Sequence, residues 1–255
     1  MLRHLRRVKT TKTMRIVHGF DNIPTISHAV ATVGSYDGVH SGHRVLIEQV
    51  IARAKARGGE SVVITFEPHP RITLGKAEGL KLLTTLEEKA LLLDRLGVDV
   101  MVVIPFDTHF SRLSHDEFID NYLIGKLGIE ELVVGYNHHF GHNKSGDYDY
   151  LTTQQSSLTV YRVEQQMVEN EKVSSTVIRP TIESGDTKGA ILLLGHTYII
   201  MGESDTNGVL AVDRYKLLPA DGSYIAIVNG VEDSITICNN AIYTNTNNRK
   251  VIVEL

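Results

Sequence analysis

The sequence predicts an α/β protein in which helices cover a parallel sheet and a smaller antiparallel β domain follows. From Ala29 to about Leu194, short β-branched runs alternate with longer amphipathic stretches, which is typical of strand–helix–strand units. After Gly195 the pattern changes to short strand-like runs separated by Asp, Asn and Gly turns. We therefore expect a basic, disordered tail over residues 1–13, an α/β domain over 14–195 and a β domain over 196–255. Met14 is a candidate for the natural start.

Hydrophobic periodicity and turn residues place the individual elements. Strands of the sheet are expected at residues 29–33, 61–66, 98–104, 131–135 and 158–162. Helices are expected at residues 42–57, 85–96, 114–127 and 175–185. Gly58 suits a left-handed cap after the first helix, and Ser114 precedes Glu117 at capping-box spacing. Strands of the β domain are expected at residues 198–201, 209–213, 224–228, 234–237 and 250–254, with residues 239–248 as a hairpin connection.

Composition excludes several classes of protein. The formal net charge of -4 gives no reason to expect nucleic acid as a partner, because proteins that bind it carry a basic face. No apolar run reaches the roughly 18 residues that a membrane span needs. The lone Cys238 cannot form an internal disulfide, which fits a reducing compartment. We therefore expect a cytoplasmic protein, for which a small anionic substrate remains possible.

The most informative segment follows the first predicted strand and reads Gly-Ser-Tyr-Asp-Gly-Val-His-Ser-Gly-His, from Gly34 to His43. The apolar residues after it recur at helical spacing, so the glycines and histidines lie at a helix N-terminus. Such a terminus presents unpaired N–H groups that favour phosphate. His40 and His43 could donate hydrogen bonds to one phosphate and stabilise the extra charge of its transition state. Ligands of open α/β sheets bind at this position, beyond the carboxyl ends of the strands.

Other common phosphate loops are absent. No Gly-x4-Gly-Lys-[Ser/Thr] occurs, and the first turn lacks Gly-x-Gly-x-x-Gly. These absences argue against a P-loop kinase and against a dinucleotide-dependent dehydrogenase. A second phosphate-binding helix start is expected at Ser174–Thr176, with Arg179 as a bidentate cation one turn later, although an ordinary N-cap is the alternative.

Four segments, in order, resemble the bacterial bifunctional riboflavin kinase/FMN adenylyltransferase family, also called FAD synthetase. Residues 34–43 resemble its Gly-x-Phe-Asp-Gly-x-His-x-Gly-His segment, and residues 65–70, Thr-Phe-Glu-Pro-His-Pro, resemble its second-strand motif. Residues 133–141, Val-Val-Gly-Tyr-Asn-His-His-Phe-Gly, resemble Val-Val-Gly-x-[Asp/Asn]-Phe-x-Phe-Gly. Residues 174–179, Ser-Ser-Thr-Val-Ile-Arg, resemble Ser-Ser-Thr-x-x-Arg. The resemblance spans about residues 29–195.

The resemblance implies a Rossmann-like nucleotidyltransferase that makes FAD and pyrophosphate from ATP and FMN, with Mg2+ held mainly through the ATP phosphates. It assigns catalytic roles to His40, His43 and Arg179. The residues that it implies for ATP binding are Gly34, Ser35, Tyr36, Asp37, Gly42, Gly135, Asn137, Ser174, Ser175 and Thr176. It places the flavin beside Phe66, Pro68 and His69, where Phe66 could stack on the ring.

The β domain departs from the family. The family's kinase module carries a Gly-x-Pro-Thr-Ala-Asn segment and a later Glu that acts as a base, and neither occurs here. Only 13 residues separate Gly202 from Lys216, and no final helix precedes Leu255. We therefore expect a truncated barrel without riboflavin kinase activity, and we interpret Glu232 and Glu254 as solvated strand-edge charges.

Two alternatives remain open for the function. The chain could be a nucleotidyltransferase acting on another phosphorylated acceptor, such as phosphopantetheine, or a non-catalytic sensor of flavin or nucleotide. A zinc site at His138, His139 and His142 is disfavoured, because no Cys pair or Glu lies at a zincin spacing. The sequence does not fix the oligomeric state.

Overall fold

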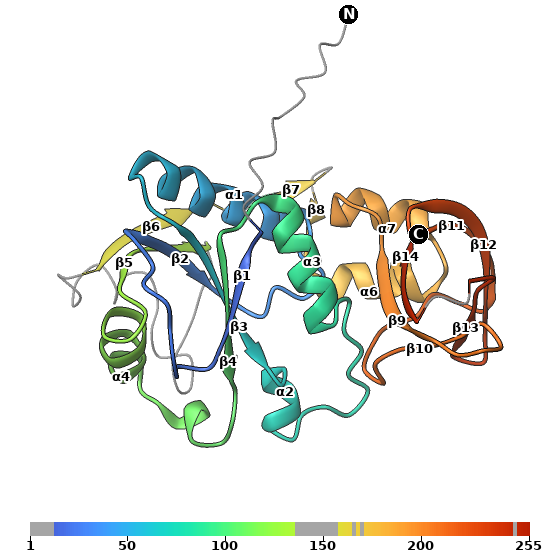
Figure 1. Ribbon diagram of the computed structural model, residues 1–255, viewed down its shortest axis with the longest axis horizontal. Helices are drawn as coiled ribbons and strands as arrows, with labels where there is room; N and C mark the ends of the chain where they lie inside the picture. The colour runs from blue at the N-terminus through green and yellow to red at the C-terminus, as the bar shows by residue number, and fades with distance from the viewer. Residues whose placement is uncertain (1–12, 136–157, 165–166, 169–170, 247–248) are drawn as a thin grey trace, which may run out of the picture.

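The computed structural model describes residues 13–135, 158–164, 167–168, 171–246 and 249–255. It contains a six-stranded parallel sheet with helices on both faces and a closed, antiparallel six-stranded barrel (Figure 1). The predicted fold class, an α/β sheet followed by an antiparallel β domain, is thereby confirmed. The predicted small β domain is thus a closed barrel of six strands.

All strands of the sheet run parallel, in the order β1-β4-β3-β2-β5-β6. They are β1 (Arg15–His18), β2 (Ala29–Val33), β3 (Ser61–Glu67), β4 (Val100–Pro105), β5 (Ile129–Gly135) and β6 (Thr159–Val163). The prediction missed β1, which pairs with β4 at the edge of the sheet. The strand has only four residues, and the side chain of Ile16 is half exposed. Such a short strand has too weak a hydrophobic pattern to be recognised in the sequence.

Helices cover both faces, so the central strands are apolar on both sides. In β4, Val100, Val102 and Ile104 pack with the helical segment 115–127, whereas Met101 and Val103 pack with α1 and α3. Helices α1 (Ser41–Ala56) and α3 (Leu86–Leu96) agree closely with the sequence, and Gly58 takes the expected left-handed conformation. A short α2 (Pro70–Thr73), which was not predicted, follows β3.

The predicted helix over residues 114–127 needs a correction. Ser114 and Glu117 form the expected capping box at the start of α4 (His115–Glu117), but a π-helix over Phe118–Ile124 follows it. There, the amide of Gly125 donates to Asp120 O, five residues back. Phe118 and Leu123 are also five residues apart and both buried, so the wider turn brings them to the same face.

The barrel has the strand order β10-β13-β12-β11-β14-β9. Its strands are β9 (Ile199–Ser204), β10 (Val209–Ala211), β11 (Gly222–Val228), β12 (Val231–Cys238), β13 (Ala241–Tyr243) and β14 (Lys250–Glu254). The stretch over residues 239–248 is more than the predicted hairpin connection, because it contains β13. Asn239 and Asn240, both with positive φ, make the tight turn between β12 and β13.

Two helices connect the sheet to the barrel (Figure 1). After the short hairpin of β7 (Met167–Val168) and β8 (Glu171–Lys172) come α6 (Ser175–Glu183) and α7 (Thr187–Leu194), the latter not predicted. Ile178, Ile182 and Leu194 belong to the same buried cluster as the inward side chains of the barrel. Side chains of the barrel and of these helices therefore fill one continuous core.

A buried ion pair fastens the sheet unit to the barrel. Lys216, before β11, donates to Glu88 Oε2 of α3 at 2.7 Å and to the carbonyls of Leu83 and Ile199, both at 2.6 Å. Glu88 Oε1 accepts from the amide of Met201 at 2.8 Å. At the surface, Glu254 is not a freely solvated charge as expected, because it pairs with Arg95 at 2.8 Å.

Candidate functional site

The candidate site lies at the carboxyl ends of β2, β3 and β5. The chain builds the sheet outward from β2 toward β3 and β4, then returns to place β5 on the other side of β2. Such a switch point opens a crevice outside the strand ends, where open α/β sheets bind ligands. Gly34 follows β2 and Gly135 ends β5, so two of the predicted nucleotide-binding residues lie at this switch point.

The segment from Gly34 to His40 forms a tight loop. Tyr36, Gly38 and Val39 all have positive φ, at 47°, 86° and 42°. For Tyr36 and Val39 this left-handed conformation is strained, and such strain is concentrated at functional sites. A Cβ atom at Gly38 would lie 2.8 Å from Leu83 Cδ1, so the position requires glycine for space as well as for conformation. Tyr36 is buried and bonds Thr32 Oγ1 through its hydroxyl, at 2.6 Å.

The loop delivers two stacked imidazoles to the start of α1. His40 is the N-cap residue, and its Nδ1 accepts from the amide of His43 at 3.4 Å. The two rings stack at 3.6 Å with an interplanar angle of 18°. An Nδ1 that accepts leaves the proton on Nε2. No described residue accepts from that N–H, so it is available to a phosphate oxygen.

Both imidazoles are neutral at neutral pH. Burial, reinforced by His196, lowers the pKa of His40 to about 4. Burial, followed by the charges of His40 and Lys89, holds the pKa of His43 well below its ordinary value. His43 Nδ1 is buried without a hydrogen-bond partner among the described residues. The pair therefore offers neutral donors to an anion, and binding of a phosphate would raise both pKa values.

The start of α6 contacts the same loop. Ser175 Oγ donates to the carbonyl of Asp37 at 2.9 Å, and Arg179 Nη2 donates to Asp37 Oδ2 at 2.5 Å. Arg179 Nε also donates to the carbonyl of Lys81 at 2.7 Å. Ser174 is the N-cap of α6, yet its side chain makes no capping hydrogen bond. The N-termini of α1 and α6 are thus joined through Asp37, with the hydroxyl of Ser174 uncommitted to the helix.

The second motif ends β3. Phe66 is partly buried and packs edge-on against Phe106 at 5.4 Å. Glu67 and Pro68 are exposed and joined by a cis peptide bond, and His69 caps α2 by accepting from the amide of Arg71 at 3.2 Å. Phe66 therefore belongs to an aromatic cluster under the sheet, while the residues after it reach the surface.

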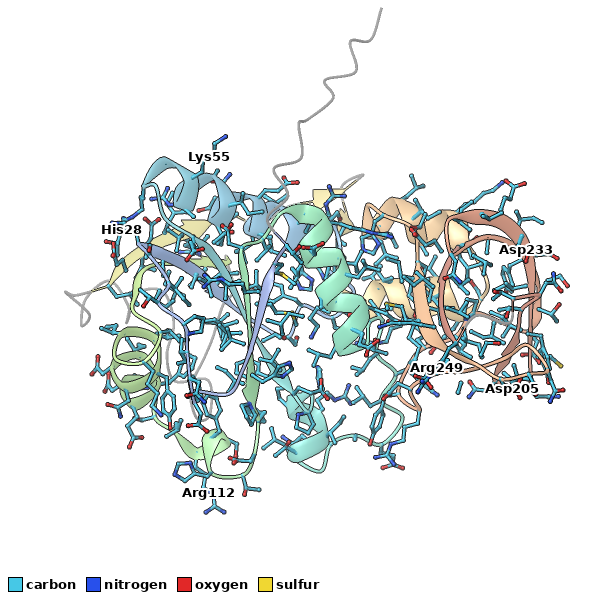
Figure 2. The ribbon with its side chains drawn as sticks, viewed as in Figure 1. His28, Lys55, Arg112, Asp205, Asp233 and Arg249 are labelled. Carbon is cyan, nitrogen blue, oxygen red and sulfur yellow. The ribbon has the colours of Figure 1, made fainter. Side chains whose placement is uncertain are left out.

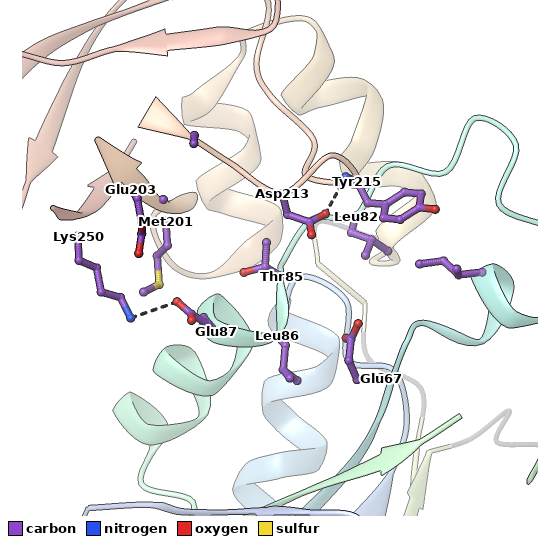
Figure 3. A pocket seen from close by; sticks show the side chains of 13 residues that line it. Glu67, Leu82, Thr85, Leu86, Glu87, Met201, Glu203, Asp213, Tyr215 and Lys250 are labelled. Atoms are coloured by element: carbon purple, nitrogen blue, oxygen red, sulfur yellow. Dashed lines mark hydrogen bonds and ion pairs between the residues drawn. The ribbon is translucent and has the colours of Figure 1, made fainter. Parts of the chain in front are cut away.

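A cleft of about 500 Å³ lies between this motif and the barrel (Figure 3). Its lining includes the carboxylates of Glu67, Glu87, Glu203 and Asp213, and Lys250 pairs with Glu87 at 3.1 Å. Neither imidazole lines it. Because the acidic lining repels anions, this cleft does not suit a triphosphate.

Lys89 of α3 is a site residue that the sequence interpretation missed. Its Nζ donates to Thr65 Oγ1 of the second motif at 3.1 Å, and Thr65 Oγ1 in turn donates to the carbonyl of Ser35 in the first motif at 3.3 Å. Its side chain is buried, and burial lowers its pKa to about 8. The sequence could not reveal this role. Lys89 lies on a helix whose apolar pattern predicts core packing, and only the folded structure shows which residues its ammonium contacts.

Not every predicted residue can be placed. Asn137, expected to hold the nucleotide, lies outside the described residues, as do His138, His139 and His142. Among the residues described, no group of three His, Cys, Asp or Glu side chains is arranged to hold a metal ion. No helix in the described part of the chain is long and apolar enough to cross a membrane.

Two comparisons with known proteins, one with family models and one with curated sequences, agree on the family. The model of the FAD synthetase family matches residues 22–177. The bifunctional riboflavin kinase/FMN adenylyltransferase of Listeria monocytogenes is 38% identical over 68% of this chain and 55% of its own length. That of Bacillus subtilis is 34% identical over 75% of this chain and 61% of its own. The chain thus spans less than two thirds of the length of these two relatives.

Two further matches concern length and fold. A putative bifunctional riboflavin kinase/FMN adenylyltransferase of Geobacillus thermodenitrificans is 35% identical over 70% of this chain and 96% of its own length. A Streptococcus pneumoniae crystal structure described as a macrolide-efflux protein superposes with a TM-score of 0.79, covering 94% of this chain and 98% of that one at 24% identity. The last match shows a shared fold alone. From the extent of the family match and the identities to these relatives, the chain belongs to the FAD synthetase family.

Proposed function

We propose that this protein is an FMN adenylyltransferase, which makes FAD and pyrophosphate from ATP and FMN. The observation that carries the proposal is the stacked pair His40 and His43 at the N-terminus of α1, with the N-terminus of α6 beside it. Two helix N-termini, two neutral imidazoles and a free serine hydroxyl make a site for several phosphate groups. The curated relatives carry FMN adenylyltransferase in their names.

In this proposal the FMN phosphate oxygen attacks the α-phosphorus of ATP, and the bond to the β-phosphate oxygen breaks. Pyrophosphate leaves with the electron pair, so no covalent enzyme intermediate forms. His40 Nε2–H and His43 donate to phosphate oxygens and stabilise the charge that grows in the transition state. The amides at the starts of α1 and α6 hold the triphosphate, while Arg179 and Asp37 fix the two helices relative to each other.

Mg2+ is part of the proposal as an ion held by ATP. Asp37, the buried carboxylate of the first motif, accepts from Leu83, Thr84 and Arg179, so both of its oxygens are engaged. The described residues therefore suit an ion coordinated by triphosphate oxygens and water, and we assign no protein ligand. When bound, Mg2+ supplies charge neutralisation to the phosphates.

The test is direct formation of FAD. The protein is incubated with ATP, Mg2+ and FMN, and FAD and pyrophosphate are measured. His43→Ala should lower turnover roughly a hundredfold. Lys55→Ala, at the far end of α1 and pointing away from the body of the protein (Figure 2), should not. Turnover with phosphopantetheine and none with FMN would favour another acceptor, and ATP binding without pyrophosphate release would favour a sensor.

We also propose that the chain lacks riboflavin kinase activity. The β9–β10 hairpin turns over residues 205–208, where the amides of Asn207 and Val209 bond Asp205 Oδ1. Apolar side chains of the strands fill the barrel core behind it. The 13 residues between Gly202 and Lys216, which include this hairpin, are too few to hold the ATP-binding loop of the kinase module. FMN formed from riboflavin and ATP would contradict this. A cytoplasmic location, consistent with a lone half-buried Cys238, remains part of the proposal.

A further inference from the structure

Two buried lysines in this protein are held in very different ways. Lys216 and Lys89 are 1% and 5% exposed. Lys216 Nζ makes three hydrogen bonds, to two carbonyls and to the carboxylate of Glu88, which use all of its donors. Among the described residues, Lys89 Nζ makes one hydrogen bond, to Thr65 Oγ1. Two N–H donors of a buried ammonium are thus left over.

The surroundings of Lys89 contain acids that do not pair with it. Asp37 and Glu67 are close enough to raise its pKa, yet neither forms an ion pair with it in the described structure. The oxygens of Asp37 are committed to Arg179 and to two backbone amides. A buried cation without a counter-ion is costly, and such groups are normally paired. The unmet donors therefore fit an anion that arrives with the ligand.

The position of Lys89 indicates which anion this is. Its charge acts on His43 of the first motif and on His69 of the second, lowering the pKa of each. Its hydrogen bond to Thr65 Oγ1, which itself donates to the carbonyl of Ser35, places it between the first motif, proposed for the ATP phosphates, and the strand end proposed for the flavin. Its one hydrogen-bond partner, Thr65, belongs to the second motif. Because the second motif is the one proposed for the flavin, the phosphate that reaches Lys89 is the one carried by the acceptor.

We propose that Lys89 Nζ binds the phosphate monoester of the acceptor through its two unmet N–H donors and holds it beside the His40–His43 pair. The inference rests on the proposed function, because it takes FMN as the acceptor. Thr65, fixed between Lys89 and the carbonyl of Ser35, sets the direction of the ammonium. Binding this phosphate also orients its oxygen for attack, which is positioning catalysis.

The experiment compares two ligands that differ only in this phosphate. Affinities for FMN and for riboflavin are measured by quenching of flavin fluorescence in wild type, Lys89→Met, Lys89→Arg and Lys55→Met. Wild type should prefer FMN, and Lys89→Met should lose roughly ten- to a hundredfold in FMN affinity with little change for riboflavin. Lys89→Arg should retain most of the preference, and the affinity for ATP should stay unchanged in Lys89→Met.

A wild type that does not prefer FMN, or a Lys89→Met variant that keeps the preference, would overturn the inference. So would an equal loss of riboflavin affinity, which would indicate a structural role. The proposed function is judged separately, from FAD formation by wild type. If Lys89→Met loses the preference for FMN but wild type forms no FAD, the transfer reaction is refuted and the phosphate contact is supported. If wild type forms FAD but Lys89→Met keeps the preference for FMN, the transfer reaction is supported and the phosphate contact is refuted.

Discussion

Arg179 Nη2 donates to Asp37 Oδ2 at 2.5 Å, and this contact joins the fourth motif to the first. Asp37 is 4% exposed, and its other oxygen accepts from the amides of Leu83 and Thr84 at 2.8 and 3.1 Å. One carboxylate therefore holds three segments that are distant in the sequence. The charge of Arg179 is already balanced before any phosphate binds.

Asp37→Ala should destabilise the protein by about 3–5 kcal/mol, because it leaves a partly buried guanidinium unpaired and two buried amides unsatisfied. Urea unfolding at neutral pH measures the loss. Asp37→Asn keeps an acceptor for the amides and should cost less. If Asp37→Ala lowered the free energy of unfolding by less than about 1 kcal/mol, the carboxylate would not be what holds these three segments together.

Stability should fall in mild acid because of His40. Its pKa is about 4 in the folded protein and near 6.5 when unfolded, so the unfolded state takes up the proton first as the pH falls. The contribution is complete above pH 6.5 and is lost progressively toward pH 4, amounting to about 3 kcal/mol. His40→Asn keeps an N-cap residue without an ionisable group. Urea titrations from pH 7 to 4.5 should show a shallower decline for this variant, and equal declines would argue against the shift.

The buried pair between α3 and the barrel should be strongly coupled. Lys216→Met leaves the carboxylate of Glu88 buried without its cation, and we expect a loss of about 3–5 kcal/mol in guanidinium unfolding. Adding Glu88→Gln should restore part of it, because an uncharged amide is cheaper to bury. Losses that simply add in the double variant would show that the two side chains act independently.

The sequence predicted the fold class, the central strands and the helix start after the glycine-rich segment because those features are local. Val30, Val63 and Val133 read as strand residues on periodicity alone, and the glycines beside His40 mark a turn. What it could not predict depends on contacts between distant segments. Glu88 and Lys89 lie on a helix whose pattern indicates core packing. Only the fold shows why both are buried, because Glu88 pairs with Lys216 beside the barrel and Lys89 reaches Thr65 of β3.

The same limit applies to Asp37 and Arg179. Both were expected to contact ATP, whereas their contact with each other becomes visible only in three dimensions. The π-helix at Phe118–Ile124 was missed for a different reason. Its capping box is that of an ordinary helix, and the wider turn follows from packing on the sheet.

The affinity for FMN should depend on pH through Lys89. Its pKa is about 8 in the free protein, and the groups that face it are Asp37, Glu67, His43 and His69. The ammonium form binds phosphate, so the FMN affinity should fall as the pH rises from 7 to 9.5. Lys89→Arg keeps its charge in this range and should give a flat profile. An affinity that rises with pH would show that the amine, as a base, is the active form.

Substitution of Ser174 can distinguish an effect on helix stability from an effect on ligand binding. It occupies the N-cap position of α6, where a serine hydroxyl normally accepts from an amide of the first turn, but its side chain makes no such bond. Ser174→Ala should therefore change the free energy of unfolding by less than about 0.5 kcal/mol, in contrast to the roughly 1 kcal/mol of an ordinary cap. If the hydroxyl binds the triphosphate, calorimetric titration should show that Ser174→Ala binds ATP several-fold more weakly, since one neutral hydrogen bond contributes about 1 kcal/mol.

Ser175→Ala, which removes the bond to the Asp37 carbonyl, is the matched comparison and should lower stability. A Ser174→Ala variant that is destabilised yet binds ATP normally would make this residue a cap after all.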